Sequence, residues 1–80
     1  MELEEAYGVV LRAARKRQGL SQEKLAGEAG VERNHISKLE LGSNSPTLRM
    51  QYKLAAALGQ SPLAMLAQVE ELIQRSQKKR

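Results

Sequence analysis

The sequence contains no cysteine, so it can form neither a disulfide bond nor a metal site with thiolate ligands. Tryptophan and phenylalanine are also absent, and the only aromatic side chains are Tyr7 and Tyr52. A chain with so few rings has no platform on which the bases of a single-stranded nucleic acid could stack. The core must therefore be built from leucine, isoleucine, valine, alanine and methionine.

Long apolar runs are missing too, because none approaches the roughly 20 residues that a transmembrane helix needs. The chain starts with the acidic segment MELEEAYG, whereas a secretory signal starts with basic residues. We therefore expect no membrane association and a cytoplasmic protein. The absence of cysteine fits a reducing compartment of this kind.

Groups suited to catalysis are scarce. The chain has one histidine, His35, and neither aspartate nor cysteine. A lone histidine on the outer face of a helix provides neither a catalytic triad nor a metal site. The adjacent carboxylates Glu70 and Glu71 fit a solvated surface. We therefore expect no enzymatic activity, no cofactor, no metal and no small-molecule ligand.

The chain is basic and short. Its 80 residues carry a net charge of +4 and suggest one small domain. Between Tyr7 and Val69 there are nine lysines and arginines but only four glutamates. A basic body of this kind attracts polyanions by counterion release. We divide the chain into one folded domain, residues 1–75, and a basic C-terminal tail, residues 76–80.

The most informative stretch is QEKLAGEAGVERNHISKLE, which runs from Gln22 to Glu40. Apolar residues recur at helical spacing on either side of Gly30: Leu25, Ala26, Ala29, Ile36 and Leu39. A glycine between two such runs permits a sharp turn with positive φ. This pattern predicts a helix-turn-helix unit, whose second helix can enter the major groove of DNA. An ordinary helical hairpin is the alternative, but the small Ala26 and the cationic outer face favour nucleic-acid binding.

The rest of the chain predicts an all-α fold of five helices. Their expected ranges are 3–18, 22–29, 32–41, 48–58 and 62–74. Ser21, Thr47 and Ser61 are the expected N-caps. Gly8, inside the first helix, either permits a close helix contact or is simply tolerated at a cost of about 1 kcal/mol.

The last predicted helix carries two apolar stripes, which is more than a domain of this size can cover. We assign Leu63 and Leu66 to the core. A second stripe is then left uncovered: Met65, Val69, Leu72 and Ile73. An exposed apolar stripe marks an interface, so we predict a homodimer through this helix. The alternative is a longer core helix that folds back on the first one.

Three segments show a familiar order of residues: LRAARKRQGLSQEKLA, GVERNHISKLELG and KLAAALGQSP. Together they span about Tyr7 to Leu66 and resemble the Cro/repressor-type (XRE-like) helix-turn-helix family of transcriptional regulators. The resemblance implies a five-helix, lambda-repressor-like DNA-binding domain that binds an inverted-repeat operator as a homodimer. In its small size and its RN-x-IS helix, the chain is most similar to controller proteins of restriction–modification systems. Phage repressors and antitoxins of the same fold are the alternative sub-families.

The resemblance also implies roles for single residues. It implies that Arg33, Asn34 and Lys38 read bases. His35 and Ser37 are expected to lie beside the DNA backbone or the next base. Gln22 takes a phosphate-or-base role, and the loop residues Ser43 and Asn44 match a segment that touches phosphates. Arg15 and Glu40 match a structural ion pair. Leu41 and Gln51 depart from the family pattern, because polar and aliphatic residues are usual at these two positions.

Side-chain chemistry agrees independently with part of this assignment. An arginine such as Arg33 can bind guanine O6 and N7 in a bidentate manner, and an asparagine such as Asn34 can do the same for adenine N6 and N7. The expected function is regulation of transcription through double-stranded DNA. The alternative is a protein-interaction adaptor of the same fold, with Leu41, Met50 and Tyr52 as its candidate partner surface.

Overall fold

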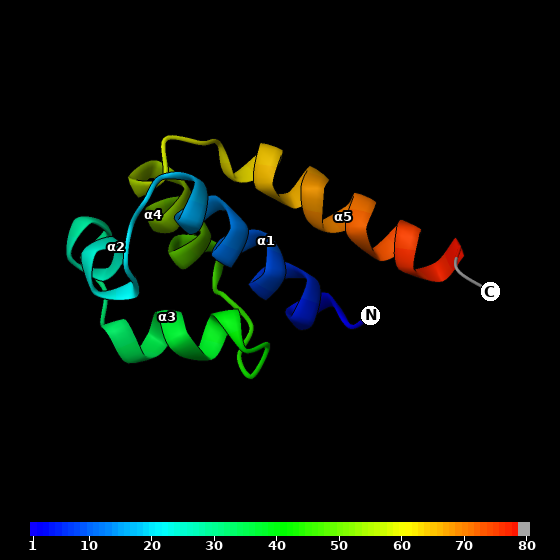
Figure 1. Ribbon diagram of the computed structural model, residues 1–80, viewed down its shortest axis with the longest axis horizontal. Helices are drawn as coiled ribbons and strands as arrows, with labels where there is room; N and C mark the ends of the chain where they lie inside the picture. Colours follow the sequence, from blue (N-terminus) through cyan, green and yellow to red (C-terminus); the bar gives the residue numbers. More distant parts are fainter. Residues whose placement is uncertain (79–80) are drawn as a thin grey trace.

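In the computed structural model, which describes residues 1–78, the chain forms five helices and, over those residues, no strand (Figure 1). The helices are α1 (Leu3–Arg17), α2 (Gln22–Ala29), α3 (Arg33–Glu40), α4 (Leu48–Ala57) and α5 (Pro62–Lys78). Helix α1 lies at the centre, with α5 along one side of it and α3 along the other. The predicted all-α, five-helix architecture is confirmed.

Local sequence signals explain where the helices begin and turn. The hydroxyls of Ser21, Thr47 and Ser61 accept hydrogen bonds from the backbone N–H groups three residues later, at 3.0–3.1 Å. These contacts satisfy donors that the first turn of a helix leaves free. Gly30 ends α2 at φ 71° and ψ 37°, in the left-handed region that a residue without a Cβ adopts without strain. The predicted caps and the predicted glycine turn are both present.

Gly8 marks the place where α1 and α3 approach most closely. A Cβ built on Gly8 would lie 2.5 Å from the backbone oxygen of Leu39 and 2.7 Å from that of Glu40. No larger residue fits without displacing backbone, because packed interiors leave no such room. Gly8 therefore serves the close helix contact, which is one of the two alternatives that the sequence leaves open.

The core is aliphatic apart from Tyr7, and α5 contributes a different face to it than the sequence suggests. Met65 and Val69 are 1% and 2% exposed, whereas Leu63 is 77% exposed and Leu66 is 39% exposed. The assignment of Met65 and Val69 to an uncovered interface stripe is therefore wrong, as is that of Leu63 and Leu66 to the core. Helical spacing identifies both stripes, but only the packing of α5 on α1 decides which one turns inward.

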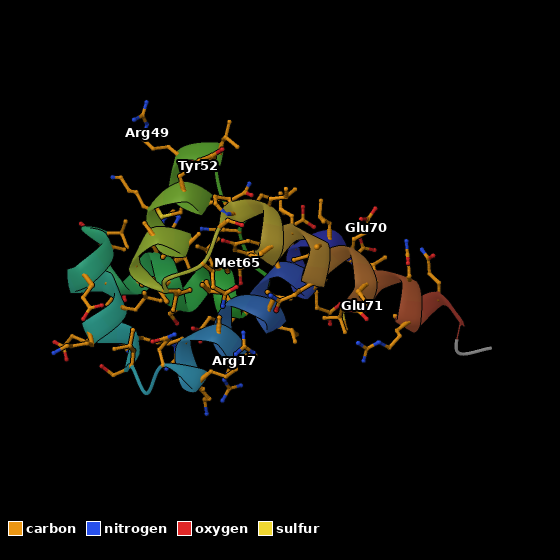
Figure 2. The ribbon with its side chains drawn as sticks, turned by 90° about the horizontal axis from the view of Figure 1, so that it is seen from above. Arg17, Arg49, Tyr52, Met65, Glu70 and Glu71 are labelled. Carbon is orange, nitrogen blue, oxygen red and sulfur yellow. The ribbon has the colours of Figure 1, made fainter. Side chains whose placement is uncertain are left out.

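The alternative of a helix folded back on α1 is the one that the structure adopts. Leu72 and Ile73 are partly buried and pack against the same core. Figure 2 shows Glu70 and Glu71 on opposite sides of α5, and Arg49 and Tyr52 of α4 on the same side as Glu70.

Helix α5 is longer than predicted. It continues past Gln74 to Lys78, so residues 76–78 are helical rather than part of a tail. Lys79 and Arg80, the end of the predicted tail, lie outside the described residues. None of the helices from Leu3 to Lys78 combines the length and the apolar character that a membrane span requires.

Candidate nucleic-acid interface

Helix α3 turns one apolar face inward and one polar face outward. Ile36 and Leu39 are fully buried, and they fix the rotation of the helix about its axis. Arg33, Asn34 and Lys38 are exposed as a consequence. Figure 1 shows α3 on the side of α1 that is opposite α5, where no other helix covers it. The three residues expected to read bases therefore share one open face of α3.

The other predicted contact residues of α3 are less accessible. His35 and Ser37 are partly buried, and the Nε2 atom of His35 is buried without a hydrogen-bond partner among the described residues. A ring in this position points toward protein rather than toward solvent. His35 therefore lies beside the open face formed by Arg33, Asn34 and Lys38.

The predicted ion pair between Arg15 and Glu40 is present and joins α1 to the end of α3. Arg15 Nε donates to Glu40 Oε2 at 2.6 Å, and Arg15 Nη2 donates to Glu40 Oε1 at 3.0 Å. A third donor of the same guanidinium, Nη1, reaches the backbone oxygen of Leu20 at 2.8 Å. The pair is largely buried, with side-chain exposures of 10% and 5%. Bidentate geometry of this kind fixes both side chains.

Gln22 belongs to the same network, a contact that the sequence alone does not predict. Its Nε2 donates to Glu40 Oε1 at 2.9 Å, so the carboxylate joins the start of α2 to the end of α3. In the sequence, only the polarity of Gln22 and Glu40 points to a hydrogen bond between them. Their spacing of 18 residues does not indicate contact. Gln22 is thereby held in place at the surface where α2 and α3 meet.

The network shifts the ionisation of its members. Burial is the largest effect on Glu40 and opposes the charged carboxylate, but the hydrogen bonds from Arg15 and Gln22 and the positive charges of Arg15 and Arg12 together outweigh it. The pKa of Glu40 is therefore lower than the ordinary carboxyl value. The hydrogen bond to Glu40 raises the pKa of Arg15. Both groups are charged at neutral pH.

A cleft of about 260 Å³ opens beside this network, and it is rich in hydrogen-bond donors. Its lining is Arg12, Arg15, Gln22, Ser37, Glu40 and Leu41. Arg15 is engaged with Glu40 and Leu20, so the guanidinium of Arg12, the amide of Gln22 and the hydroxyl of Ser37 are the donors that suit an anion such as a phosphate. The cleft lies where α1, α2 and α3 meet, so it borders the open face of α3.

The loop after α3 is anchored to the start of α1. Gly42 takes φ 78°, and a Cβ at this residue would lie 3.1 Å from the Cα of Glu5. Ser45 donates a hydrogen bond from its hydroxyl to Glu4 Oε2 at 2.8 Å. Ser43 is exposed and Asn44 is partly buried. Ser43 and Asn44, the predicted contact residues of the loop, therefore lie between two residues that are fixed to α1, Gly42 and Ser45.

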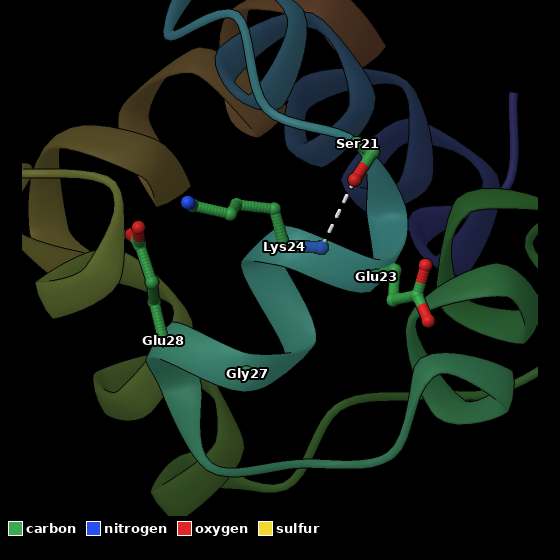
Figure 3. A pocket seen from close by; sticks show the side chains of 5 residues that line it. All are labelled: Ser21, Glu23, Lys24, Gly27 and Glu28. Carbon is green, nitrogen blue, oxygen red and sulfur yellow. Dashed lines mark hydrogen bonds between the residues drawn. The ribbon is translucent and has the colours of Figure 1, made fainter.

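The outer face of α2 differs in character from that of α3. Figure 3 shows a shallow surface hollow there, with Glu23 and Glu28 beside a single lysine, Lys24. Ser21 accepts the backbone N–H of Lys24, as the dashed line marks. Carboxylates on this face do not favour a polyanion. Among residues 1–78, no group of three or more histidine, cysteine, aspartate or glutamate side chains is placed to hold a metal ion.

Comparison with known proteins places this geometry in a family. The helix-turn-helix family model matches residues 11–66. An HTH-type transcriptional regulator of Sinorhizobium fredii, y4dJ, is 31% identical over 71 residues, which is 89% of this chain and 92% of that protein.

Solved structures agree with this placement. The clp gene regulator ClgR of Corynebacterium glutamicum matches 98% of this chain and 85% of its own, with 28% identity and a TM-score of 0.87. The restriction–modification controller protein C.AhdI of Aeromonas hydrophila matches 78% of this chain and 94% of its own, with 35% identity and a TM-score of 0.76. The chain thus belongs to the helix-turn-helix family of transcriptional regulators, with the lambda-repressor-like fold.

Proposed function

We propose that the chain binds double-stranded DNA sequence-specifically, as a homodimer on an inverted-repeat operator, and that α3 is its recognition helix. The observation that carries this proposal is the two-sided character of α3. Ile36 and Leu39 are completely buried while Arg33, Asn34 and Lys38 are exposed, so the polar edge has one fixed direction. An edge of this kind at the start of the second helix of a helix-turn-helix unit suits the major groove.

Each exposed residue has a matching chemical partner in that groove. Arg33 binds guanine through two hydrogen bonds, Asn34 binds adenine in the same manner, and Lys38 reaches guanine or a phosphate. All three come from α3, which is held against α1 through Gly8 and against α2 through the Glu40 network. A rigid support of this kind is what base readout requires.

Backbone contacts supply the remaining affinity. The cleft beside α3 offers Arg12, Gln22 and Ser37 to one phosphate, and Ser43 and Asn44 extend the contact along the strand. Phosphate contacts fix the register of the protein but do not read sequence. Loss of Gln22 or Lys38 through substitution by alanine is therefore expected to weaken binding to all sequences alike, if Lys38 contacts a phosphate rather than a base.

The proposed dimer surface is a revised version of the predicted one. A groove of about 440 Å³ runs along α5 and the start of α1, lined by Leu3, Leu63, Leu66, Ala67, Val69, Glu70 and Ile73. Leu63 and Leu3 are more than half exposed, at 77% and 58%. Burial of one such side chain contributes about 1.5–3 kcal/mol. A second copy can bury the same groove by two-fold symmetry, because isologous contacts are self-complementary.

Selection of bound duplexes from a random DNA pool tests the proposed function. We expect an enriched inverted repeat whose half-sites lie about 34 Å apart, and a complex mass that corresponds to two protomers on one duplex. A pool without enrichment would contradict the proposal and favour the adaptor alternative. In that case the highly exposed Leu41 and Tyr52 would be the first surface to examine.

The dimer surface has its own test. Leu63→Glu is expected to shift the mass in solution from dimer to monomer at micromolar concentration, because it places a charge in the apolar groove. Val9→Glu is the matched control, since Val9 is an exposed apolar residue of α1 that does not line the groove. A wild-type chain that is monomeric at this concentration, or a dimer that Leu63→Glu leaves intact, would contradict the proposed surface.

A further inference from the structure

The exposed face of α4 combines apolar and basic side chains. Leu48 and Tyr52 lie one turn apart on it and are 69% and 60% exposed. Arg49 and Lys53 are exposed beside them, and α4 contains no acidic residue. Large apolar side chains that gather on one turn are typical of a contact surface, and the basic residues favour a partner that carries carboxylates.

This face of α4 is continuous with the groove along α5. A partly open hollow lies between the two helices, and its lining includes Gln51 of α4 and Leu66 of α5. Leu66 and Leu3 line both the hollow and the α5 groove. Gln51 follows Leu48 by three residues and precedes Tyr52 directly. One largely apolar surface therefore runs from the α5 groove to the exposed face of α4.

The position of α3 decides which side of the molecule can contact a second copy on DNA. Figure 1 shows α3 on the side of α1 that is opposite α5. Two copies on one duplex both turn α3 toward the DNA, so their two-fold axis runs in the direction from α5 to α3. The contact between the copies therefore lies on a lateral side. Figure 2, seen from above, shows Arg49, Tyr52 and Glu70 on one such side, and Arg17 and Glu71 on the other.

Arg49 and Glu70 are matched across such an axis. The ion pairs among the described residues involve neither of them. In Figure 2 they lie on the same side but at different places along the long axis of the molecule. A two-fold axis that crosses the long axis exchanges the two ends, so it brings Arg49 of one copy toward Glu70 of the other. Glu70 also lines the α5 groove, where the contact is proposed.

We propose that the dimer contact extends from the α5 groove across α4, with a second copy of this chain as its occupant. Leu48 and Tyr52 form part of its apolar centre, and Arg49 of each copy pairs with Glu70 of the other. The symmetry repeats this ion pair twice. This inference rests on the proposed homodimer and adds the α4 surface and the pair to it.

Charge reversal tests the pair on the chain without DNA, by analytical ultracentrifugation. Arg49→Glu and Glu70→Arg are each expected to raise the dimer dissociation constant about tenfold, because each replaces two attractions by two repulsions. The double variant restores opposite charges and is expected to return close to the wild-type value. Arg17→Glu and Glu71→Arg make the same charge changes on the other lateral side and are expected to leave the constant unchanged. A double variant that dimerises no better than the single ones would overturn the pair.

The apolar part of the proposal has a separate test. Tyr52→Ala is expected to raise the dimer dissociation constant about tenfold or more. Leu41→Ala is the matched control, since Leu41 is 75% exposed but lines the cleft beside Glu40 instead of the hollow. Circular dichroism verifies that each variant is folded.

The outcomes separate this inference from the proposed function. A dimer that Leu63→Glu disrupts, but that Tyr52→Ala and the charge reversals leave intact, would confine the contact to the α5 groove and overturn the inference alone. A monomeric wild type would overturn it together with the proposed dimer. Selection of bound duplexes tests DNA binding independently of either result.

Discussion

The guanidinium of Arg15 and the carboxylate of Glu40 meet through two hydrogen bonds, of 2.6 Å and 3.0 Å, although the residues are 25 positions apart. This contact links α1 to the end of α3. Gln22 links the start of α2 to the same carboxylate. The orientation of α3 relative to α1 and α2 therefore depends on one buried charged network.

Removing one member of the pair is expected to be costly. Arg15→Ala leaves the carboxylate of Glu40 buried without its counter-charge, and we expect it to lower the free energy of unfolding by about 3–5 kcal/mol. The double variant Arg15→Met with Glu40→Leu is expected to recover much of this loss, because no charge remains buried. Chemical denaturation monitored by circular dichroism measures both.

The control for this prediction is an exposed pair of the same type. On the surface of α5, Arg75 Nη2 lies 3.4 Å from Glu71 Oε2, and both side chains are more than 60% exposed. We expect Arg75→Ala to change the free energy of unfolding by less than about 1 kcal/mol. An Arg15→Ala variant as stable as Arg75→Ala would show that the buried pair does not hold the helices together.

Glycine positions give a second matched comparison. Gly8→Ala places a methyl group 2.5 Å from the backbone oxygen of Leu39, and we expect it to destabilise the fold by about 1–3 kcal/mol. Gly27→Ala adds the same group within α2, where it meets no atom within 4 Å apart from its chain neighbours and the local helix backbone. We expect Gly27→Ala to stabilise by about 0.5–1 kcal/mol through helix propensity. A thermal unfolding midpoint that Gly8→Ala leaves unchanged or raises would contradict the close packing at Gly8.

The buried hydroxyl of Tyr7 predicts a loss of stability at alkaline pH. Burial raises the pKa of Tyr7 to about 12 from an ordinary value of 10.0. The folded state therefore favours the protonated phenol, so this contribution is fully present below pH ~10 and is lost as the pH rises toward 12. The stability difference between wild type and Tyr7→Phe is expected to shift by about 2–3 kcal/mol against the wild type over that interval.

The titration itself checks the same prediction. In a Tyr52→Phe background Tyr7 is the sole tyrosine, so ultraviolet absorbance of the tyrosinate follows Tyr7 alone. A midpoint near 10 in the folded protein would contradict the burial of the hydroxyl.

Much of the fold is predictable because its signals are local. The caps at Ser21, Thr47 and Ser61 and the turn at Gly30 are encoded in a few adjacent residues, and the structure confirms each of them. The Arg15–Glu40 pair came from the family resemblance rather than from spacing. The contact between Gln22 and Glu40 was not predicted. The two residues lie in different helices, and a contact between helices produces no periodic pattern in the sequence.

The faces of α5 were assigned wrongly for a related reason. Leu63 and Leu66 satisfy helical spacing as well as Met65 and Val69 do, so periodicity alone cannot choose between the two stripes. The choice is made where α5 packs against α1, which is a tertiary property. The roles of Arg33, Asn34 and Lys38 stay predictions. A side chain must be exposed to contact a base, but its exposure does not show which base it contacts.

The affinity of the Arg33→Ala variant for a selected duplex tests the account most directly. Measured by fluorescence anisotropy at fixed salt, it is expected to fall by about 1–3 kcal/mol, with relaxed preference at one base pair. Arg75→Ala, which removes a charge from the far end of α5, is expected to retain both affinity and preference. An Arg33→Ala variant that binds the same duplex with unchanged affinity and unchanged base preference would contradict the assignment of α3 as the recognition helix.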